Sequence, residues 1–132
     1  MSGLRNVLLI VLLTAAGNSA MADWIAIGSS KSNTLYIDPS TIRGTDDKTR
    51  MWALSDFKTA QHLDESEPYK SQKAEYEYNC KDARLRVLYI TSYSANMAEG
   101  DIVDFNMAPG DWIQVPRGSA TEALWKIACR KA

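Results

Sequence analysis

Histidine and cysteine are scarce in this chain, and their scarcity narrows the chemistry that the protein can perform. The 132 residues include a single histidine, His62, and two cysteines. The chain also lacks a Gly-x-Ser-x-Gly elbow, a glycine-rich phosphate loop and a histidine pair. His62, with Asp64 two residues on, could serve as a general base, but no nucleophile or second ligand stands nearby, so we interpret it as a solvated loop residue. These absences predict a protein that is not an enzyme and holds no cofactor.

A long hydrophobic run is also missing. The apolar run Val7–Leu13 is much shorter than the roughly 20 residues that a membrane-spanning helix needs. It follows Arg5 and precedes Ala20-Met-Ala22, which together form the pattern of a secretory signal peptide. We therefore expect residues 1–22 to be a signal peptide and residues 23–132 to be the exported domain, without a membrane span. An uncleaved N-terminal membrane anchor is the alternative, and the lack of a cysteine at the cleavage point disfavours a lipid anchor.

Neither sign of charge dominates the chain. Its 15 basic and 16 acidic residues give a formal net charge of −1 at pH 7. Such a balance provides no overall attraction to nucleic acid or to an anionic membrane. Aromatic residues are plentiful, with four tryptophans and six tyrosines, so a disordered chain is excluded. Repeats, low-complexity tracts and linkers are absent, and we expect one domain.

The two cysteines, Cys80 and Cys129, both belong to the exported part. An even number of cysteines in an oxidising compartment favours a disulfide between them. The alternatives are a metal-binding pair and two free thiols. Two cysteines and one distant histidine fall short of the four ligands that zinc usually takes.

The clearest helix runs from Ser119 to Cys129. Ser119 and Glu122 form a capping box, in which the serine oxygen accepts from the Glu122 amide and the carboxylate reaches back to the Ser119 amide. Apolar residues then recur at helical spacing and form one stripe: Ala120, Ala123, Leu124, Ile127 and Ala128. A helix of about three turns is marginal alone in water. It must therefore pack on the rest of the chain, and Cys129 suggests how it is fastened there.

The chain before this helix alternates as β-strands do. We expect strands at 24–27, 35–37, 48–58, 69–80, 84–94 and 102–106, and a single helical turn at Asp38–Ile42. In the strand 69–80, the face with Tyr76, Tyr78 and Cys80 should lie under the helix. The face with Ser71, Lys73, Glu75 and Glu77 should be wet. The predicted fold class is α+β: a meandering antiparallel sheet of about six strands, with one C-terminal helix packed on a face and tethered by a disulfide.

An acidic segment is a candidate cation site. Glu99, Asp101 and Asp104, with Asp111 not far on, offer oxygen ligands for a hard cation. They lack the dense spacing of a calcium-binding loop, so a solvated turn is the better interpretation, and we predict no metal site.

Arginines on the strand 84–94 are a candidate binding feature. Arg84 and Arg86 could join Arg50 in a basic patch suited to carboxylate or sulfate groups, although pairing with Glu75 or Glu77 is the more ordinary interpretation. The alternating positions Arg84, Arg86, Leu88 and Ile90 mix basic and apolar groups, as interfaces do. We predict that this face binds a protein partner, with a second copy of the chain as one possibility.

Several phrases of the exported part resemble the surface-adhesin protein E family, in order and over almost its whole length. They are Tyr36-Ile-Asp-Pro-Ser-Thr-Ile-Arg43, Met51-Trp-Ala-Leu-Ser-Asp-Phe-Lys-Thr-Ala-Gln61, Tyr69-Lys-Ser-Gln-Lys73, Glu75-Tyr-Glu-Tyr-Asn-Cys80, Arg84-Leu-Arg86, Tyr93-Ser94 with Met97 and Gly100, and Trp112 through Cys129. The resemblance implies a six-stranded antiparallel sheet with a C-terminal helix held by a disulfide, dimeric in some members. Trp52, Asp56, Cys80, Trp112 and Trp125 are interpreted as fold determinants, and no binding residue is carried over.

The function that this resemblance implies is adhesive. The namesake of the family is an outer-membrane lipoprotein of a Gram-negative pathogen that binds host extracellular-matrix and serum proteins. We therefore expect a non-enzymatic, exported binding module in the periplasm or on the cell surface of a Gram-negative bacterium, with a host or matrix protein as its partner. The alternative is a soluble periplasmic accessory protein that binds a small ligand or another envelope component. The missing lipid-attachment cysteine is a departure from the namesake.

Overall fold

The structure, a computed structural model, describes residues 22–45, 47–62, 67–107 and 109–131. These residues form seven strands and one helix. The elements are β1 (Ile25–Ser29), β2 (Asn33–Gly44), β3 (Lys48–Gln61), β4 (Tyr69–Asn79), β5 (Arg84–Tyr93), β6 (Ile102–Asn106), β7 (Ile113–Gln114) and α2 (Ala120–Ala128).

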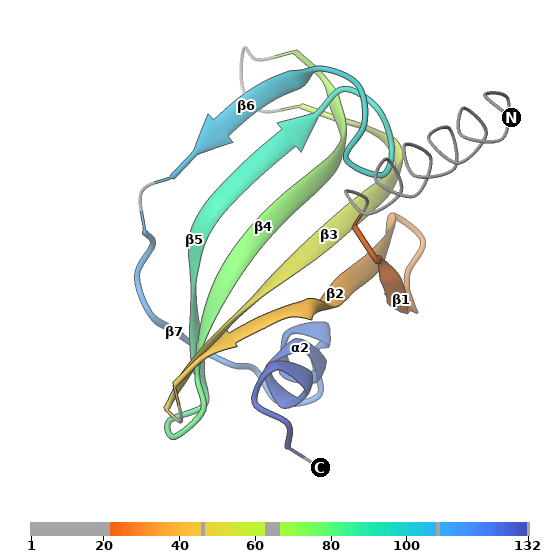
Figure 1. Cartoon of the computed structure of the whole chain (residues 1–132). Coiled ribbons are helices and arrows are strands. Elements are labelled where there is room, and N and C mark those ends of the chain that lie inside the picture. The colour runs from red at the N-terminus through yellow and green to blue at the C-terminus, as the bar shows by residue number, and fades with distance from the viewer. Residues whose placement is uncertain (1–21, 46, 63–66, 108, 132) are drawn as a thin grey trace, which may run out of the picture.

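The strands β1 to β6 lie side by side in chain order, and each is antiparallel to the next. The short strand β7 pairs with the beginning of β5. Figure 1 shows the long strands fanning apart from one narrow end of the sheet. At the turn between β4 and β5, the Asn79 side-chain oxygen accepts from the amides of Lys81 at 3.1 Å and Asp82 at 3.0 Å, which is how asparagine stabilises tight turns. The predicted antiparallel meander is confirmed.

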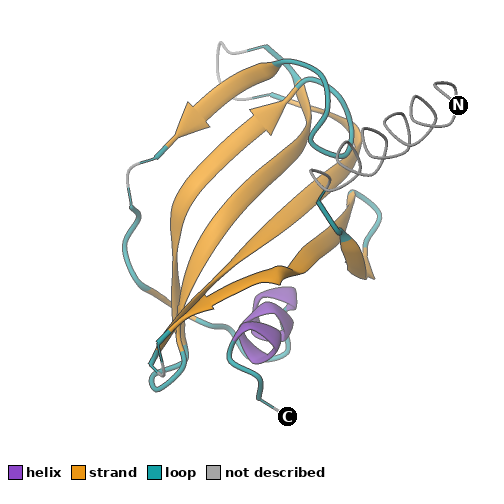
Figure 2. Cartoon of the chain, in the orientation of Figure 1, coloured by secondary structure: helices purple, strands orange, loops and turns teal. Residues whose placement is uncertain are grey.

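Helix α2 lies against one face of the sheet (Figure 2). Ser119 caps it as predicted, because its side chain accepts from the Glu122 amide at 3.2 Å. The Glu122 carboxylate accepts from the amide of Gly118 at 3.2 Å, one residue earlier than the capping box predicted. Leu124 and Ala128 are the buried helix residues. They complete a core whose sheet residues are Ile37, Met51, Ala53, Tyr78 and Leu85.

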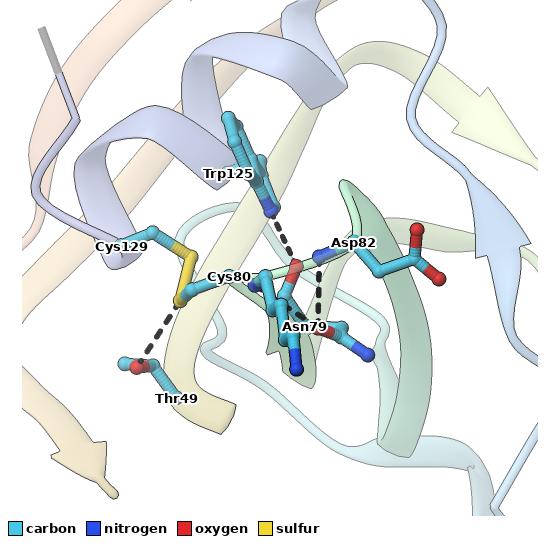
Figure 3. The surroundings of a disulfide bond; sticks show 7 residues. Thr49, Asn79, Cys80, Asp82, Trp125 and Cys129 are labelled. Atoms are coloured by element: carbon cyan, nitrogen blue, oxygen red, sulfur yellow. Dashed lines mark hydrogen bonds between the residues drawn. A yellow bond between two sulfur atoms is a disulfide. The ribbon is translucent and has the colours of Figure 1, made fainter. Parts of the chain in front are cut away.

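A disulfide fastens the helix to the end of β4, which confirms the predicted fold. It joins Cys80 to Cys129, with their Cα atoms 5.4 Å apart. Figure 3 shows a hydrogen bond beside the disulfide that also joins the helix to the sheet, in which Trp125 Nε1 donates to the carbonyl oxygen of Asn79 at 2.8 Å. Thr49 Oγ1 of β3 lies 3.6 Å from the Cys80 sulfur. The helix is thereby held over the face that carries Tyr78.

The predicted helical turn at Asp38–Ile42 is wrong, because this segment stays within β2 as a large bulge. Asp38 Oδ1 accepts from the Ser40 amide at 3.1 Å, so the turn chemistry of the aspartate is present. The Thr41 hydroxyl then accepts from the amide of Trp52 on β3 at 3.0 Å and replaces a missing ladder bond. A proline, Pro39, has no amide hydrogen to offer a ladder, and a bulge tolerates it.

The strand register assigns residues to two faces, because directly opposed residues point to the same side of a sheet. One row on the side of the helix, which we call the helix face, contains Ile37, Ala53, Ala74 and Ile90. The next row lies on the other side, on which no described helix lies, and we call this side the open face. That row contains Asp38, Trp52, Glu75 and Tyr89.

Candidate functional site

The four residues predicted to form one protein-binding face are Arg84, Arg86, Leu88 and Ile90, and the structure separates them. The register between β4 and β5 shifts after Glu75, which makes Leu88 the extra residue of a β-bulge. Arg84 and Arg86 consequently lie on the open face, whereas Ile90 lies on the helix face. Leu88 is only 6% exposed. The prediction of a shared face is therefore wrong, because strict alternation ends at the bulge, and the binding role of these residues stays a prediction.

Glu77 is the centre of an ion cluster on the open face. Its Oε1 accepts from Arg86 Nε at 2.9 Å and lies 2.8 Å from Arg86 Nη2. Its Oε2 lies 3.6 Å from Arg50 Nε. Arg86 also stacks on Trp112, with its Cζ 4.8 Å from the ring centroid, a favourable cation–π contact. Arg50 and Arg86 therefore lie together, as the predicted basic patch requires, and both pair with Glu77, as the alternative interpretation predicted. Arg84 does not join them, because it pairs with Asp82 at 3.3 Å.

Glu75 lies at the middle of the same face and is fully buried. Its Oε2 is 3.1 Å from Arg43 Nη2, while its Oε1 has no hydrogen-bond partner among the described residues. Trp52 and Tyr89 oppose it on either side, and their rings stack with centroids 6.1 Å apart. The predicted wet face of β4 is wrong at this position, because neighbouring side chains, and not a helix, exclude water from the carboxylate.

Lys73 extends the cluster towards the other end of the open face. Its Nζ lies 5.1 Å from the Trp52 ring centroid and 5.9 Å from that of Tyr93. The open face therefore presents tryptophan, tyrosine and arginine together, the residue types that dominate binding energy at protein interfaces. The sequence signalled this only through its abundance of aromatic residues.

Residues 94–100 fold over that end of the open face. Asp56 Oδ1 accepts from the amide of Met97 at 2.8 Å, and Ser71 Oγ accepts from the amide of Ala98 at 2.9 Å. Met97 and Ala98 have φ angles of 57° and 59°. This left-handed conformation costs a non-glycine residue about 1–2 kcal/mol. The interpretation of Asp56 as a fold determinant agrees with these bonds. They also explain why Ser71, predicted to be wet, is buried.

The strand β6 carries the most exposed of the large hydrophobic side chains on the described strands. Ile102 is 62% exposed and Phe105 is 54% exposed, and Met107 just after the strand is 60% exposed. A second bulge places Ile102 opposite Tyr93 and Phe105 opposite Thr91, so both side chains lie on the open face. Alternation alone would put them on opposite faces, and sequence reasoning therefore missed them. We call these three residues the β6 margin.

A shallow apolar cleft of about 350 Å³ adjoins the edge of β5. Arg86 and Ile90, two of the predicted binding residues, both line it, together with Tyr76, Leu85, Val87, Gly110, Asp111 and Ile113. The Gly110 amide donates to the carbonyl oxygen of Val87 at 2.8 Å, which closes one wall of the cleft. The cleft beside β5 therefore brings Arg86 and Ile90 together, although their side chains belong to different faces of the sheet.

Two tyrosines of the helix face, Tyr76 and Tyr78, are the groups with clearly perturbed acidity. Burial raises the pKa of both phenols, and the neighbouring Tyr76 raises the pKa of Tyr78 further. Their ring centroids are 6.2 Å apart. The Tyr78 hydroxyl is buried without a hydrogen-bond partner among the described residues. A higher pKa keeps both phenols neutral, as core residues require.

The other sequence candidates are not brought together. His62 is exposed at the end of the chain segment that contains β3, and Asp64 lies outside the described residues. Glu99 and Asp101 are exposed in a turn closed by backbone bonds. Within the described ranges, no three His, Cys, Asp or Glu residues are grouped so that they could hold a metal ion. No helix in the same ranges has the length and apolarity to cross a membrane.

A sequence model of the surface-adhesin protein E family matches residues 24–130, nearly the whole described fold. The chain belongs to this family. The family consists of exported cell-surface proteins, which confirms the predicted export, whereas a signal peptide ending at residue 22 stays a prediction. No curated protein sequence matches the chain.

Solved structures of Haemophilus influenzae protein E share the fold of this surface-adhesin chain. Its crystal form II gives a TM-score of 0.65 at 12% identity, covering 85% of this chain and 91% of that one. Another structure of the same protein gives 0.63 at 12% identity, covering 85% and 87%. Protein E from non-typeable Haemophilus influenzae gives 0.57 at 10% identity, covering 83% and 86%. At such low identity the likeness concerns the fold alone.

Proposed function

We propose that this chain is a non-enzymatic binding module of the cell envelope that engages a host or matrix protein along the β6 margin. The observation that carries the proposal is the exposure of Ile102, Phe105 and Met107, each more than half accessible to solvent. Isolated exposed hydrophobic residues are ordinary, but Ile102 and Phe105 share one face of the edge strand β6 and Met107 follows it directly, and clustered exposed apolar residues are typical of interaction surfaces. Membership of a surface-adhesin family supports a protein partner.

The surroundings of the β6 margin favour a protein contact over a small ligand. The strand β6 is the last in the sheet order and, in the described part of the chain, pairs with β5 alone. Tyr93 and Lys73 lie beside the margin on the open face. Apolar anchors with a polar and aromatic rim are the usual anatomy of a protein interface. Arg86 and Ile90 extend this surface along the cleft at the β5 edge.

The test compares binding of the mature chain to immobilised matrix and serum proteins with that of an Ile102→Ser/Phe105→Ser variant. Because each side chain contributes roughly 1.5–3 kcal/mol when fully buried, the double change should weaken binding at least about tenfold. Ile25→Ser is the matched control, since Ile25 is 53% exposed on the opposite edge strand β1. Circular dichroism verifies that each variant is folded.

Equal binding by the double variant and by wild type would remove the β6 margin from the proposal. Arg86→Glu/Ile90→Asp then tests the neighbouring cleft in the same assay. Sedimentation of wild type separates a second copy of the chain from a different partner. A dimer that the β6 double variant abolishes, with no matrix protein bound, would replace the adhesive role by self-association.

A specific cavity supports the alternative of a periplasmic protein that binds a small ligand. A cleft of about 380 Å³ lies between the β1–β2 turn and the start of α2. Ile27, Leu35, Ala120 and Ala123 give it apolar walls, and Ser29, Ser30, Asn33 and Ser119 are among its polar ones. Its volume is within the usual range of ligand sites. A small molecule that stays with the purified protein in native mass spectrometry, and is lost in Ala123→Trp, would favour this function.

A further inference from the structure

The open face carries a second surface feature at its other end, beside the turn that joins β2 to β3. A cleft of about 400 Å³ is lined there by Arg43, Gly44, Thr45, Lys48, Arg50 and Glu77. Three of these six residues are cationic and one is acidic. The wall beside Gly44 is backbone, because its φ is 145° and an added Cβ would lie 2.2 Å from the Lys48 carbonyl oxygen. A side chain at position 44 would therefore distort this part of the cleft.

The two arginines of this cleft form ion pairs with buried carboxylates. The Glu75 and Glu77 side chains are 1% and 9% exposed, whereas those of Arg43 and Arg50 are 64% and 41% exposed. The contacts with the glutamates use one nitrogen of Arg43 and one of Arg50. A guanidinium has five N–H donors, so most of these donors are left on the solvent side. The arginines are thus positioned before any ligand arrives, which lowers the entropic cost of binding one.

The cations form a strip across the sheet. Arg43, Arg50, Glu77 and Arg86 oppose one another in register on the four strands β2 to β5. At a strand spacing of about 4.8 Å, the row spans roughly 14 Å. Arg86, at its far end, is 30% exposed in its side chain. We call Arg43, Lys48, Arg50 and Arg86 the basic strip.

Positive charge remains in excess along the basic strip. Its four cations face two carboxylates, those of Glu75 and Glu77, which are both buried. Lys48 has no ion pair with a described residue, and the exposed Asp47 of the turn forms none with these cations. A row of cations longer than a single phosphate or sulfate suits a ligand that carries several negative charges in a line.

Aromatic rings accompany the charges. Trp112 stacks on Arg86 at one end of the basic strip, and the Trp52–Tyr89 pair occupies the neighbouring row. Such rings offer flat apolar surfaces beside the guanidinium groups, and the C–H faces of sugar rings match them in shape. Arginine forks fit sulfate and carboxylate groups through two parallel hydrogen bonds. This combination favours a charged sugar chain over an acidic peptide.

We propose that the basic strip binds an anionic polysaccharide, whose sulfate or carboxylate groups are received by the outer donors of Arg43, Arg50 and Arg86. This site is separate from the β6 margin. Along β5, Arg86 precedes Thr91, the partner of Phe105, by five residues, or roughly 16 Å of strand. The strip shares Arg86 with the cleft at the β5 edge, but it contains no residue of the β6 margin, so variants of that margin test the two sites separately.

The experiment uses the mature chain and heparin as the sulfated polysaccharide, with fluorescence anisotropy as the readout. Arg43→Gln/Arg50→Gln should weaken heparin binding at least about tenfold, because two of the positioned forks are removed. Lys126→Gln/Lys131→Gln is the matched control, since it removes the same charge from the helix region and should change affinity less than about twofold. The Ile102→Ser/Phe105→Ser variant should bind heparin as wild type does.

A second variant keeps the test decisive if loss of Arg43 unfolds the chain around buried Glu75. Lys48→Gln leaves both buried ion pairs intact and should still weaken heparin binding several-fold. Two outcomes would overturn the proposal: wild type that fails to bind heparin at about 0.15 M salt, or equal losses in the strip and control variants. Tighter binding of a poly-glutamate peptide than of heparin would replace the polysaccharide by an acidic protein segment.

Discussion

Single residues of this sheet bury polar groups in two different ways. On the open face, both side-chain oxygens of Glu77 are buried against arginine partners. On the helix face, the Tyr78 hydroxyl is buried with no partner among the described residues. A buried polar group without a partner costs about 1–3 kcal/mol, whereas a paired one contributes modestly. Burial of a polar group therefore costs stability at Tyr78, where the hydroxyl has no partner among the described residues, but not in the same way at Glu77, where arginines pair with it.

The change Tyr78→Phe should accordingly leave the free energy of unfolding at pH 7 unchanged or raise it by about 1 kcal/mol. Tyr78→Ala should lower it by roughly 3–5 kcal/mol, as loss of a large buried ring does. Urea unfolding measures both values. A Phe variant that is clearly less stable than wild type would mean that the hydroxyl has a hydrogen-bond partner after all.

Alkaline pH separates the Phe variant from wild type further. Burial raises the pKa of Tyr78 far above its usual value of 10.0. Above about pH 10, the usual pKa of tyrosine, the unfolded chain releases the phenol proton and the folded chain keeps it. The free energy of unfolding therefore falls as pH rises, by about 1.4 kcal/mol per pH unit. Tyr78→Phe is spared this loss. Its stability advantage should therefore grow between pH 9 and about pH 11, with Tyr76 contributing equally to the decline in both proteins.

The helix and the order of the strands could be predicted from the sequence, because local patterns determine both. The helix from Ser119 was predicted because its cap and its apolar spacing are both local. The order of the strands followed from short turns such as Lys81-Asp82. The bulges at Leu88 and in β6 could not be predicted, because a bulge depends on how two distant strands pair. Each bulge moves side chains to another face, and this is why the prediction of one shared face for Arg86 and Ile90 was wrong although the predicted fold was right.

The helix is also the element whose attachment can be tested. The Cys80–Cys129 disulfide closes a separation of 49 residues, so the double variant Cys80→Ser/Cys129→Ser should lose roughly 2–5 kcal/mol of unfolding free energy. Urea unfolding followed by tryptophan fluorescence measures the loss. A reductant should destabilise wild type and leave the variant unaffected. A loss below about 1 kcal/mol would indicate that Trp125 and the core contacts alone hold the helix.

The described part of the molecule has one helix for two sheet faces, so one face is left without a covering helix. The helix face is occupied by the core around Tyr78 and Leu124. The open face covers its own carboxylates with arginine and aromatic side chains, and it keeps those groups available to partners. Its two ends differ in chemistry: the β6 margin is apolar and the basic strip is charged. The two proposals therefore place a protein partner and a polyanion at different ends of one face.

Asp23, the predicted first residue of the exported chain, lies close to a buried carboxylate. The Asp23 backbone nitrogen donates to Asp38 Oδ2 at 3.2 Å, and Asp38 is 4% exposed. Cleavage after Ala22, as the sequence predicts, would turn this nitrogen into a charged ammonium group beside a carboxylate. We therefore expect intact-mass analysis of the exported protein to show a chain that begins at Asp23. The full-length chain, or a lipid adduct, would contradict this.

We expect the new ammonium charge to raise the free energy of unfolding as well. A chain that begins at Asp23 should be more stable to urea than one that retains Met21-Ala22, by up to about 1 kcal/mol, because Asp23 is exposed and solvent screens its side of the ion pair. Asp38→Asn is the control, since it removes the carboxylate and should abolish the difference between the two N-termini. If the difference persists in Asp38→Asn, the ammonium group acts through another partner. If no difference exists in wild type, processing releases the chain without strengthening its fold.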